Sequence, residues 1–210
     1  MDIIKQINQA VMKGDDQQVI SLVNRTLEEK VKISIVINQG LIEAMSVVGS
    51  KMASGEMFVP EVLMSARAMK AGLEILKPLM ESGDMDNYGT VLIGTVKGDL
   101  HDIGKNLVAM MLESSGFEVI DLGVDLTKEA FINAVQEHKP EVIGLSALLT
   151  TTMPAMRDTI ETLRECGVKS KIVVGGAPVS ESFAQEVGAD GYAADAAGAV
   201  VLVKRLAKKE

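Results

Sequence analysis

Residues 90–106 read TVLIGTVKGDLHDIGKN, and this stretch decides the fold class of the C-terminal part of the chain. It opens on an apolar run of the kind found in strands that are buried on both faces of a parallel sheet. A turn follows that holds Gly98, Gly104, two aspartates and His101, one of only two histidines in the sequence. Apolar residues then recur at helical spacing over residues 104–115. The stretch therefore predicts a strand, a polar loop and a helix.

The same alternation of short apolar runs and helical patterns continues toward the C-terminus. Strands are predicted at residues 90–96, 118–122, 142–146, 171–174 and 190–193, and helices at 104–115, 128–138 and 154–166. Repeated strand–helix units of this kind form a parallel sheet with helices on both faces. Ligands of such sheets bind beyond the carboxyl ends of the strands, where the winding changes direction. The polar loop at residues 97–106 is placed at such an end.

The first 80 residues have a helical rhythm throughout. They predict four helices: one that ends before Gly14, one capped by Asp15, one over residues 33–52, and one with Pro60 in its first turn that Pro78 kinks or ends. Residues 81–88, ESGDMDNY, lose this rhythm and predict a linker. We therefore expect a helical domain at 1–82, a linker at 83–88 and an α/β domain at 89–210.

Composition excludes several classes of protein. The 210 residues are 47% hydrophobic and 24% charged, which is typical of a soluble globular chain. A net charge of −8 with 3% aromatic residues and no Trp argues against a nucleic-acid partner. The single cysteine, Cys166, makes an intramolecular disulfide impossible, and no leader is apparent, so we expect a cytoplasmic protein. The longest uncharged run, residues 142–156, is too short to span a bilayer, so no membrane anchor is expected.

The loop at residues 97–106 does not fit the common phosphate-binding motifs. Gly98 and Gly104 are separated by five residues, not four, and Asn106 stands where a phosphate loop needs Ser or Thr. The three glycines of a dinucleotide fingerprint are missing as well. What remains is His101, two residues after Asp99, in a spacing that lets one ring nitrogen bind a metal while the carboxylate holds the proton of the other. The alternative is a solvated loop histidine, with Asp99 capping the following helix.

A conventional zinc site would need three or four ligands. The remaining candidates are His138, at the end of another predicted helix, and Cys166. A single protein ligand suggests a metal that is already held by a macrocycle.

The loop resembles the D-x-H-x-x-G motif of cobalamin-binding domains, with the residues Gly98-Asp99-x-His101-Asp102-x-Gly104-Lys105-Asn106. Ser146-Ala147-Leu148 matches the S-x-L element of these domains, and Gly175-Gly176 matches their G-G pair. Over essentially its whole length the chain resembles stand-alone corrinoid proteins of methyltransferase systems for methanol, methylamines, glycine betaine or aryl methyl ethers, and the cobalamin module of methionine synthase. The resemblance implies a flavodoxin-like (Rossmann-type) parallel five-stranded sheet with an N-terminal four-helix bundle as a cap.

The resemblance also implies roles for individual residues. His101 would be the lower axial ligand of cobalt, and Asp99 and Thr152 would complete a proton relay. The residues expected to contact the cofactor or its nucleotide tail are Gly98, Asp99, Leu100, His101, Asp102, Ile103, Gly104, Ser146, Leu148, Thr150, Gly175, Gly176, Tyr192 and Ala193. Two alternatives stay open from the residues alone: the glycine pair as an ordinary turn, and Thr152 as a helix cap before Pro154.

The function implied is that of a methyl carrier with cobalamin as cofactor, which is methylcobalamin in the loaded state. The partners implied are a substrate-specific methyltransferase, a second methyltransferase that serves tetrahydrofolate or a thiol coenzyme, and a reductive activation protein. The chain itself would supply no substrate pocket. A cobalamin-dependent sensor and the small subunit of a B12-dependent isomerase are the alternatives.

Overall fold

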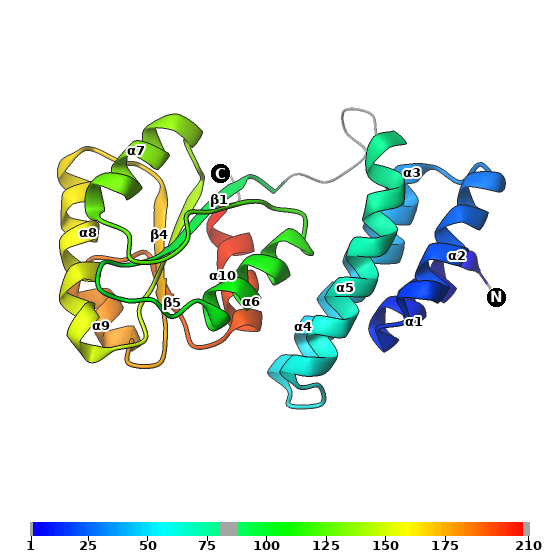
Figure 1. Cartoon of the computed structure of the whole chain (residues 1–210), viewed down its shortest axis with the longest axis horizontal. Helices are drawn as coiled ribbons and strands as arrows, with labels where there is room; N and C mark the ends of the chain where they lie inside the picture. The colour runs from blue at the N-terminus through cyan, green and yellow to red at the C-terminus, as the bar shows by residue number, and fades with distance from the viewer. Residues whose placement is uncertain (1, 80–87, 208–210) are drawn as a thin grey trace. The chain divides into compact units, whose positions relative to one another are not determined.

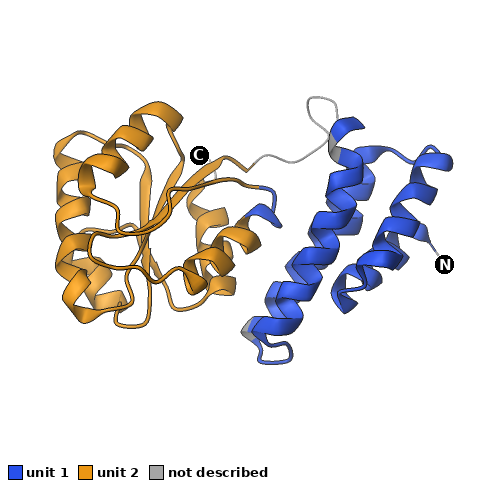
Figure 2. Cartoon of the chain, viewed as in Figure 1, with its two compact units in different colours: residues 1–87, 113–116 blue, residues 88–112, 117–210 orange. Residues whose placement is uncertain are grey.

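A computed structural model describes residues 2–79 and 88–207, and it divides the chain into two compact units (Figures 1 and 2). One comprises residues 1–87 with 113–116, and the other comprises residues 88–112 with 117–210. The predicted linker, apart from Tyr88, lies outside the described residues. The domain boundaries at 82 and 89 therefore stay predictions.

The N-terminal unit is helical, as the sequence predicts. Its elements are α1 (Ile3–Lys13), α2 (Asp16–Glu28), α3 (Ile33–Ile35), the π-helix η1 (Val36–Ile42), α4 (Glu43–Ala53), α5 (Val59–Leu76) and the 3-10 turn η2 (Lys77–Leu79). Gly14 ends α1 in the left-handed conformation, with φ of 69°, and the Asp15 carboxylate caps α2 by accepting from the Gln18 amide. Pro60 lies in the first turn of α5 and Pro78 follows its end.

The predicted third helix differs from the expectation because its first half is a π-helix. Within η1 and at its end, bonds reach one residue further back than in an α-helix, and the Glu43 amide donates to the Asn38 carbonyl. The periodicity of the apolar residues does not distinguish this geometry from an α-helix over two turns.

Gly40 lies against the Ile7 side chain of α1, where an added Cβ would be 3.2 Å from Cγ2.

The stretch Ile33–Met52 is long and apolar enough, by length and composition, to cross a membrane. Its side chains nevertheless form the core of the helical unit, since Val36, Ile37, Leu41 and Val48 have no exposed area. A buried core helix passes the same test of length and composition.

The second unit contains a parallel sheet in the order β2-β1-β3-β4-β5. Its strands are β1 (Thr90–Thr95), β2 (Glu118–Asp121), β3 (Val142–Ser146), β4 (Lys171–Gly175) and β5 (Gly191–Ala193). Its helices are α6 (Ile103–Glu113), α7 (Lys128–His138), the 3-10 turn η3 (Thr150–Thr152), α8 (Met153–Glu165), α9 (Glu181–Glu186) and α10 (Ala196–Ala207). The flavodoxin-like parallel sheet predicted from the sequence is confirmed.

Helices cover both faces of this sheet (Figure 1). On one face α7, α8 and α9 bury Phe131, Met156 and Phe183 against apolar strand residues. On the other face α6 and α10 bury Leu112 and Leu202. The strands are therefore apolar on both sides, which explains why they appear in the sequence as continuous apolar runs.

The strand register aligns the carboxyl ends of four strands. Thr95 pairs with Ser146, Ser146 with Gly175, and Gly175 with Ala193. The winding reverses between β1 and β3, and the loops that follow these two strands flank the reversal. This edge is where a ligand of a doubly wound sheet is expected.

Candidate functional site

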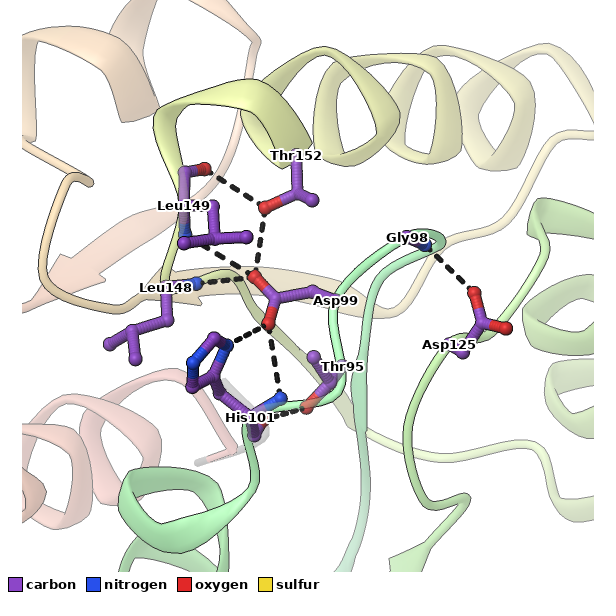
Figure 3. A network of polar contacts seen from close by, with 8 residues as sticks. All are labelled: Thr95, Gly98, Asp99, His101, Asp125, Leu148, Leu149 and Thr152. Carbon is purple, nitrogen blue, oxygen red and sulfur yellow. Dashed lines mark hydrogen bonds and ion pairs between the residues drawn. The ribbon is translucent and has the colours of Figure 1, made fainter.

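Asp99 is the centre of a polar network at this edge (Figure 3). Its side chain is completely buried and lies in the loop between β1 and α6. Oδ1 accepts from the His101 amide at 3.1 Å and lies 2.7 Å from His101 Nδ1. Oδ2 accepts from the amides of Leu148 and Leu149 at 2.7 and 3.3 Å and from the Thr152 hydroxyl at 2.8 Å. Both carboxylate oxygens of Asp99 thus have hydrogen-bond partners.

These donors determine the ionisation of Asp99. Burial alone raises the pKa of a carboxyl group, because it removes water from the charged form. Hydrogen bonds from the Leu148 amide, from His101 and from the Thr152 hydroxyl outweigh burial and hold the pKa of Asp99 well below its usual range. Asp99 is therefore a permanent carboxylate at neutral pH.

His101 is held by its neighbours in one orientation. Asp99 occupies Nδ1, which leaves Nε2 as the ring nitrogen that can bind a metal. The Thr95 hydroxyl donates to the His101 carbonyl at 3.0 Å, which restrains the His101 backbone. The His101 side chain is about half exposed. None of the described donors to Asp99 is an amide of α6, so Asp99 orients His101 and does not cap that helix.

Thr152 contacts Asp99 directly and does not act as a helix cap. It precedes α8 and is 5% exposed, but its side chain makes no capping hydrogen bond. Its hydroxyl donates to Asp99 and also lies 2.9 Å from the Leu149 carbonyl. The three residues Asp99, His101 and Thr152 therefore form one connected arrangement (Figure 3).

At Gly175 and Gly176 the backbone at the end of β4 lies closer to the backbone after β3 than it would in an ordinary turn. The Ala147 amide donates to the Gly175 carbonyl at 3.2 Å. Gly176 has φ of +124°, and an added Cβ would lie 1.8 Å from the Ala147 carbonyl oxygen. No side chain fits there, so the glycine is required by a close backbone approach.

The other predicted cofactor-binding residues lie along the same edge of the sheet. Ser146, Leu148 and Thr150 follow one another at the end of β3, and Tyr192 and Ala193 are on β5. Around His101, the apolar side chains of Leu100 in the loop and of Ile103 at the start of α6 are 72% and 85% exposed, and Gly98, Asp102 and Gly104 are also exposed.

The sequence reasoning missed four contributors to the site. Leu149 donates its amide to Asp99, and Asp125 accepts from the Gly98 amide at 2.8 Å. Lys105, whose side chain is 1% exposed, forms an ion pair with Asp121 at the end of β2. Lys105 belongs to the motif quoted above, but nothing in the sequence indicated that its side chain is buried, and the only signal for Asp121 was its place near a strand end.

Comparison with known proteins identifies the family. One B12 binding domain model matches residues 89–201, and a second matches residues 3–77. The chain belongs to the B12-binding domain family. It is 41% identical over 214 residues to a corrinoid protein of Desulfitobacterium hafniense, covering 100% of this chain and 99% of that protein. It is also 41% identical over 208 residues to dimethylamine corrinoid protein 1 of Methanosarcina acetivorans, covering 98% and 97%.

Solved structures agree with this assignment. The chain is similar to the methanol:cobalamin methyltransferase complex of Methanosarcina barkeri, with a TM-score of 0.85 and 35% identity over 95% of this chain and 77% of that one. It is similar to a cobalamin-binding protein from Desulfitobacterium hafniense, with a TM-score of 0.81 and 32% identity over 98% of both chains.

The residues of this chain fit a cobalamin. The described residues contain no group of three or more His, Cys, Asp or Glu side chains that could hold a bare metal ion. A half-exposed imidazole with one committed nitrogen instead suits a metal whose remaining ligands come from a macrocycle. The exposed side chains of Leu100, in the same loop, and of Ile103, at the start of α6, offer an apolar surface to such a ring.

Proposed function

We propose that this chain is a corrinoid protein that carries a methyl group between a substrate-specific methyltransferase and a second methyltransferase. The observation that carries the proposal is the Asp99–His101 contact of 2.7 Å at the carboxyl edge of the sheet, which leaves Nε2 available. Relatives over the full length of the chain are named as dimethylamine and trimethylamine corrinoid proteins. These names favour a carrier over a sensor or the small subunit of an isomerase.

The bound cobalamin would supply a cobalt ion that accepts and releases the methyl group. His101 would bind this cobalt ion through Nε2. Asp99 would hold the proton of Nδ1 and thereby keep Nε2 basic and correctly oriented. Thr152 would stabilise the Asp99 carboxylate through its hydroxyl and complete the relay by which the imidazole gains or loses a proton.

The strand-end residues would accommodate the nucleotide tail of the cofactor. Small residues at the ends of β3, β4 and β5 permit close approach to the backbone. We assign this role to Ser146, Leu148, Thr150, Gly175, Gly176, Tyr192 and Ala193. The loop residues Gly98, Leu100 and Asp102 and the first residues of α6, Ile103 and Gly104, would contact the cofactor around His101.

The finer identity of the partners is also part of the proposal. The second methyltransferase would pass the methyl group to tetrahydrofolate or a thiol coenzyme, and a reductive activation protein would restore the carrier after oxidation. We place this system in the cytoplasm, without nucleic-acid or membrane partners. The methyl donor is chosen by the partner enzyme.

The test is reconstitution with hydroxocobalamin, reduction to cobalt(II), and electron paramagnetic resonance. Wild-type protein is expected to show coupling to one axial nitrogen, and His101→Ala is expected to lose it. His138→Ala is the matched control, because His138 is the other histidine and ends α7. Identical nitrogen coupling in wild type and His101→Ala would contradict the assignment. Screening methyl donors with candidate methyltransferases then tests the carrier function.

A further inference from the structure

Asp125 lies in the loop between β2 and α7 and contacts the Asp99 loop from the side opposite to Thr152 (Figure 3). Its Oδ1 accepts from the Gly98 amide at 2.8 Å. Its own amide donates to the Asp99 carbonyl at 3.0 Å. One residue thus holds the backbone on both sides of the peptide that joins Gly98 to Asp99.

The two loops run side by side beyond the end of the sheet. The Thr95 amide donates to the Gly123 carbonyl and the Leu126 amide to the Thr95 carbonyl, both at 3.0 Å, and Val96 and Leu126 form a β-bridge. The contacts of Asp125 extend this pairing to the turn itself. Gly98 has φ of +84°, which glycine adopts without steric cost, but glycine is also the most flexible residue, so contacts such as these hold the turn in one conformation.

Asp125 adopts an uncommon backbone conformation in order to make these contacts. Its φ is +54°, in the left-handed region that few residues other than glycine adopt. Residues held in such conformations persist only where the surrounding structure requires them, and they concentrate at functional sites. In this conformation Asp125 presents both its amide and its carboxylate to the Asp99 loop.

A surface ion pair with Lys97 is the alternative reason for an aspartate at this position. Lys97 Nζ lies 3.0 Å from the Asp125 carboxylate, but the two side chains are 57% and 40% exposed. Exposed ion pairs of this kind contribute little. The Gly98 amide is the stronger influence on this carboxyl group and, ahead of Lys97, holds the pKa of Asp125 below its ordinary value.

We propose that Asp125 is a positioning residue for the axial histidine. The Asp99 side chain is fixed from one side by Leu148, Leu149 and Thr152, and its backbone is fixed from the other side by Asp125. Both restraints are needed to hold the Asp99 carboxylate at hydrogen-bond distance from the His101 ring, because a carboxylate on a loose turn can pivot about its remaining contacts. This inference rests on the proposed function, in which His101 binds cobalt.

Three variants separate the Gly98 contact from the ion pair. Asp125→Gly keeps the left-handed backbone and removes the carboxylate, Asp125→Asn keeps an acceptor oxygen and removes the charge, and Lys97→Met removes only the ion pair. Each protein is reconstituted with hydroxocobalamin and reduced, and the fraction of cobalt(II) with an axial nitrogen is measured by electron paramagnetic resonance. Exchange of the Gly98 amide proton in the cofactor-free protein reports the turn directly, and a melting temperature reports general stability.

Asp125→Gly is expected to lower the equilibrium constant for histidine ligation about threefold to tenfold. This is no more than the loss of affinity expected when a residue that hydrogen-bonds directly to a metal-binding histidine is replaced. It should also accelerate exchange of the Gly98 amide. Asp125→Asn should retain most of the ligation, and Lys97→Met should match wild type.

If Asp125→Gly leaves the fraction of nitrogen-bound cobalt(II) unchanged, the proposed role of Asp125 is wrong. It is also wrong if Lys97→Met lowers this fraction as much as Asp125→Gly does. A lowered melting temperature with unchanged ligation would mean a structural role only and would also overturn it. Absence of axial nitrogen in wild type would refute the proposed function itself, which distinguishes the two failures.

Discussion

The two units bury polar side chains in different ways. Among the residues of 2–79 whose burial is described, the buried polar residues are Thr26 and Ser65, which are neutral and donate to the carbonyls of Val23 and Met12. Asn38 also buries its side-chain oxygen, which belongs to a neutral amide. The α/β unit buries two charged residues, Asp99 and Lys105, only six positions apart in the sequence. The helical unit is therefore built for packing, and the β1–α6 segment is built to hold charges.

Burying the charged side chains of Asp99 and Lys105 has an energetic cost in the α/β unit. A buried charge is tolerated only when partners satisfy it. Asp99 has its full set of donors, and Lys105 contacts Asp121 and the Asn106 side chain at 2.7 Å. Asn106 in turn donates to Asp102, next to His101, at 3.1 Å. Both buried charges thus restrain the loop that carries the proposed ligand.

The largest effect is expected from Gly176→Ala, which should destabilise the α/β unit by about 3 kcal/mol or more. The added Cβ would collide with a backbone carbonyl that cannot move without separating β3 from β4. Gly188→Ala is the control, since Gly188 has φ of +72° with no atom within 4 Å, and should cost only about 1 kcal/mol. Urea unfolding followed by tyrosine fluorescence reports this unit, because both tyrosines, Tyr88 and Tyr192, belong to it. Equal losses in the two variants would contradict the steric argument.

Lys105→Met should destabilise the α/β unit by about 2 kcal/mol, which is less than for a fully buried ion pair because Asp121 is 36% exposed. The cause is the Asp121 carboxylate, which loses its cationic partner although its Oδ1 still accepts from the Gly123 amide at 2.9 Å. The double variant Lys105→Met/Asp121→Leu should recover part of the loss, as measured by the same unfolding experiment. A double variant less stable than the single one would show that Asp121 stabilises the fold through another contact, such as the Gly123 amide at 2.9 Å from Oδ1, and would contradict the unpaired carboxylate as the cause.

Asp99→Asn should cost about 1 to 3 kcal/mol at pH 7, because a charged acceptor is lost from its buried donors. The folded pKa of Asp99 is lowered, so the stability that its charge contributes is fully present above the unfolded value of about 3.9 and is lost as the pH falls below it. The stability difference between wild type and Asp99→Asn should therefore shrink between pH 7 and pH 3. Urea midpoints at the two pH values measure it, and a constant difference would contradict the assigned ionisation.

The smallest effect is expected from Arg25→Met in the helical unit. Arg25 and Glu29 form an ion pair at 2.8 Å, but their side chains are 57% and 44% exposed. Such a pair on a helix contributes at most about 0.5 kcal/mol. Circular dichroism during urea unfolding should give a midpoint close to wild type, and the small difference should vanish in 1 M salt. If Arg25→Met lost as much stability as Lys105→Met, the two units would not differ in how much their charged side chains contribute.

Secondary structure was predictable where it depends on local pattern. The five strands lie within one or two residues of the predicted runs, since parallel strands covered on both faces are continuously apolar. The caps at Gly14 and Asp15 followed from residue type. The π-helix η1 was not predictable, because one extra residue per turn leaves the short-range apolar pattern nearly unchanged.

By itself the sequence determined the alternation of strands and helices, and with it the edge of the sheet where Asp99 and His101 lie. Only the tertiary structure decided which groups converge there. The Leu148 amide and the Thr152 hydroxyl are 49 and 53 positions from Asp99, and Asp125 is 27 positions from Gly98. Contacts over such separations are fixed by strand register and loop path, which follow from packing of the whole sheet and leave no trace in the spacing of neighbouring residues.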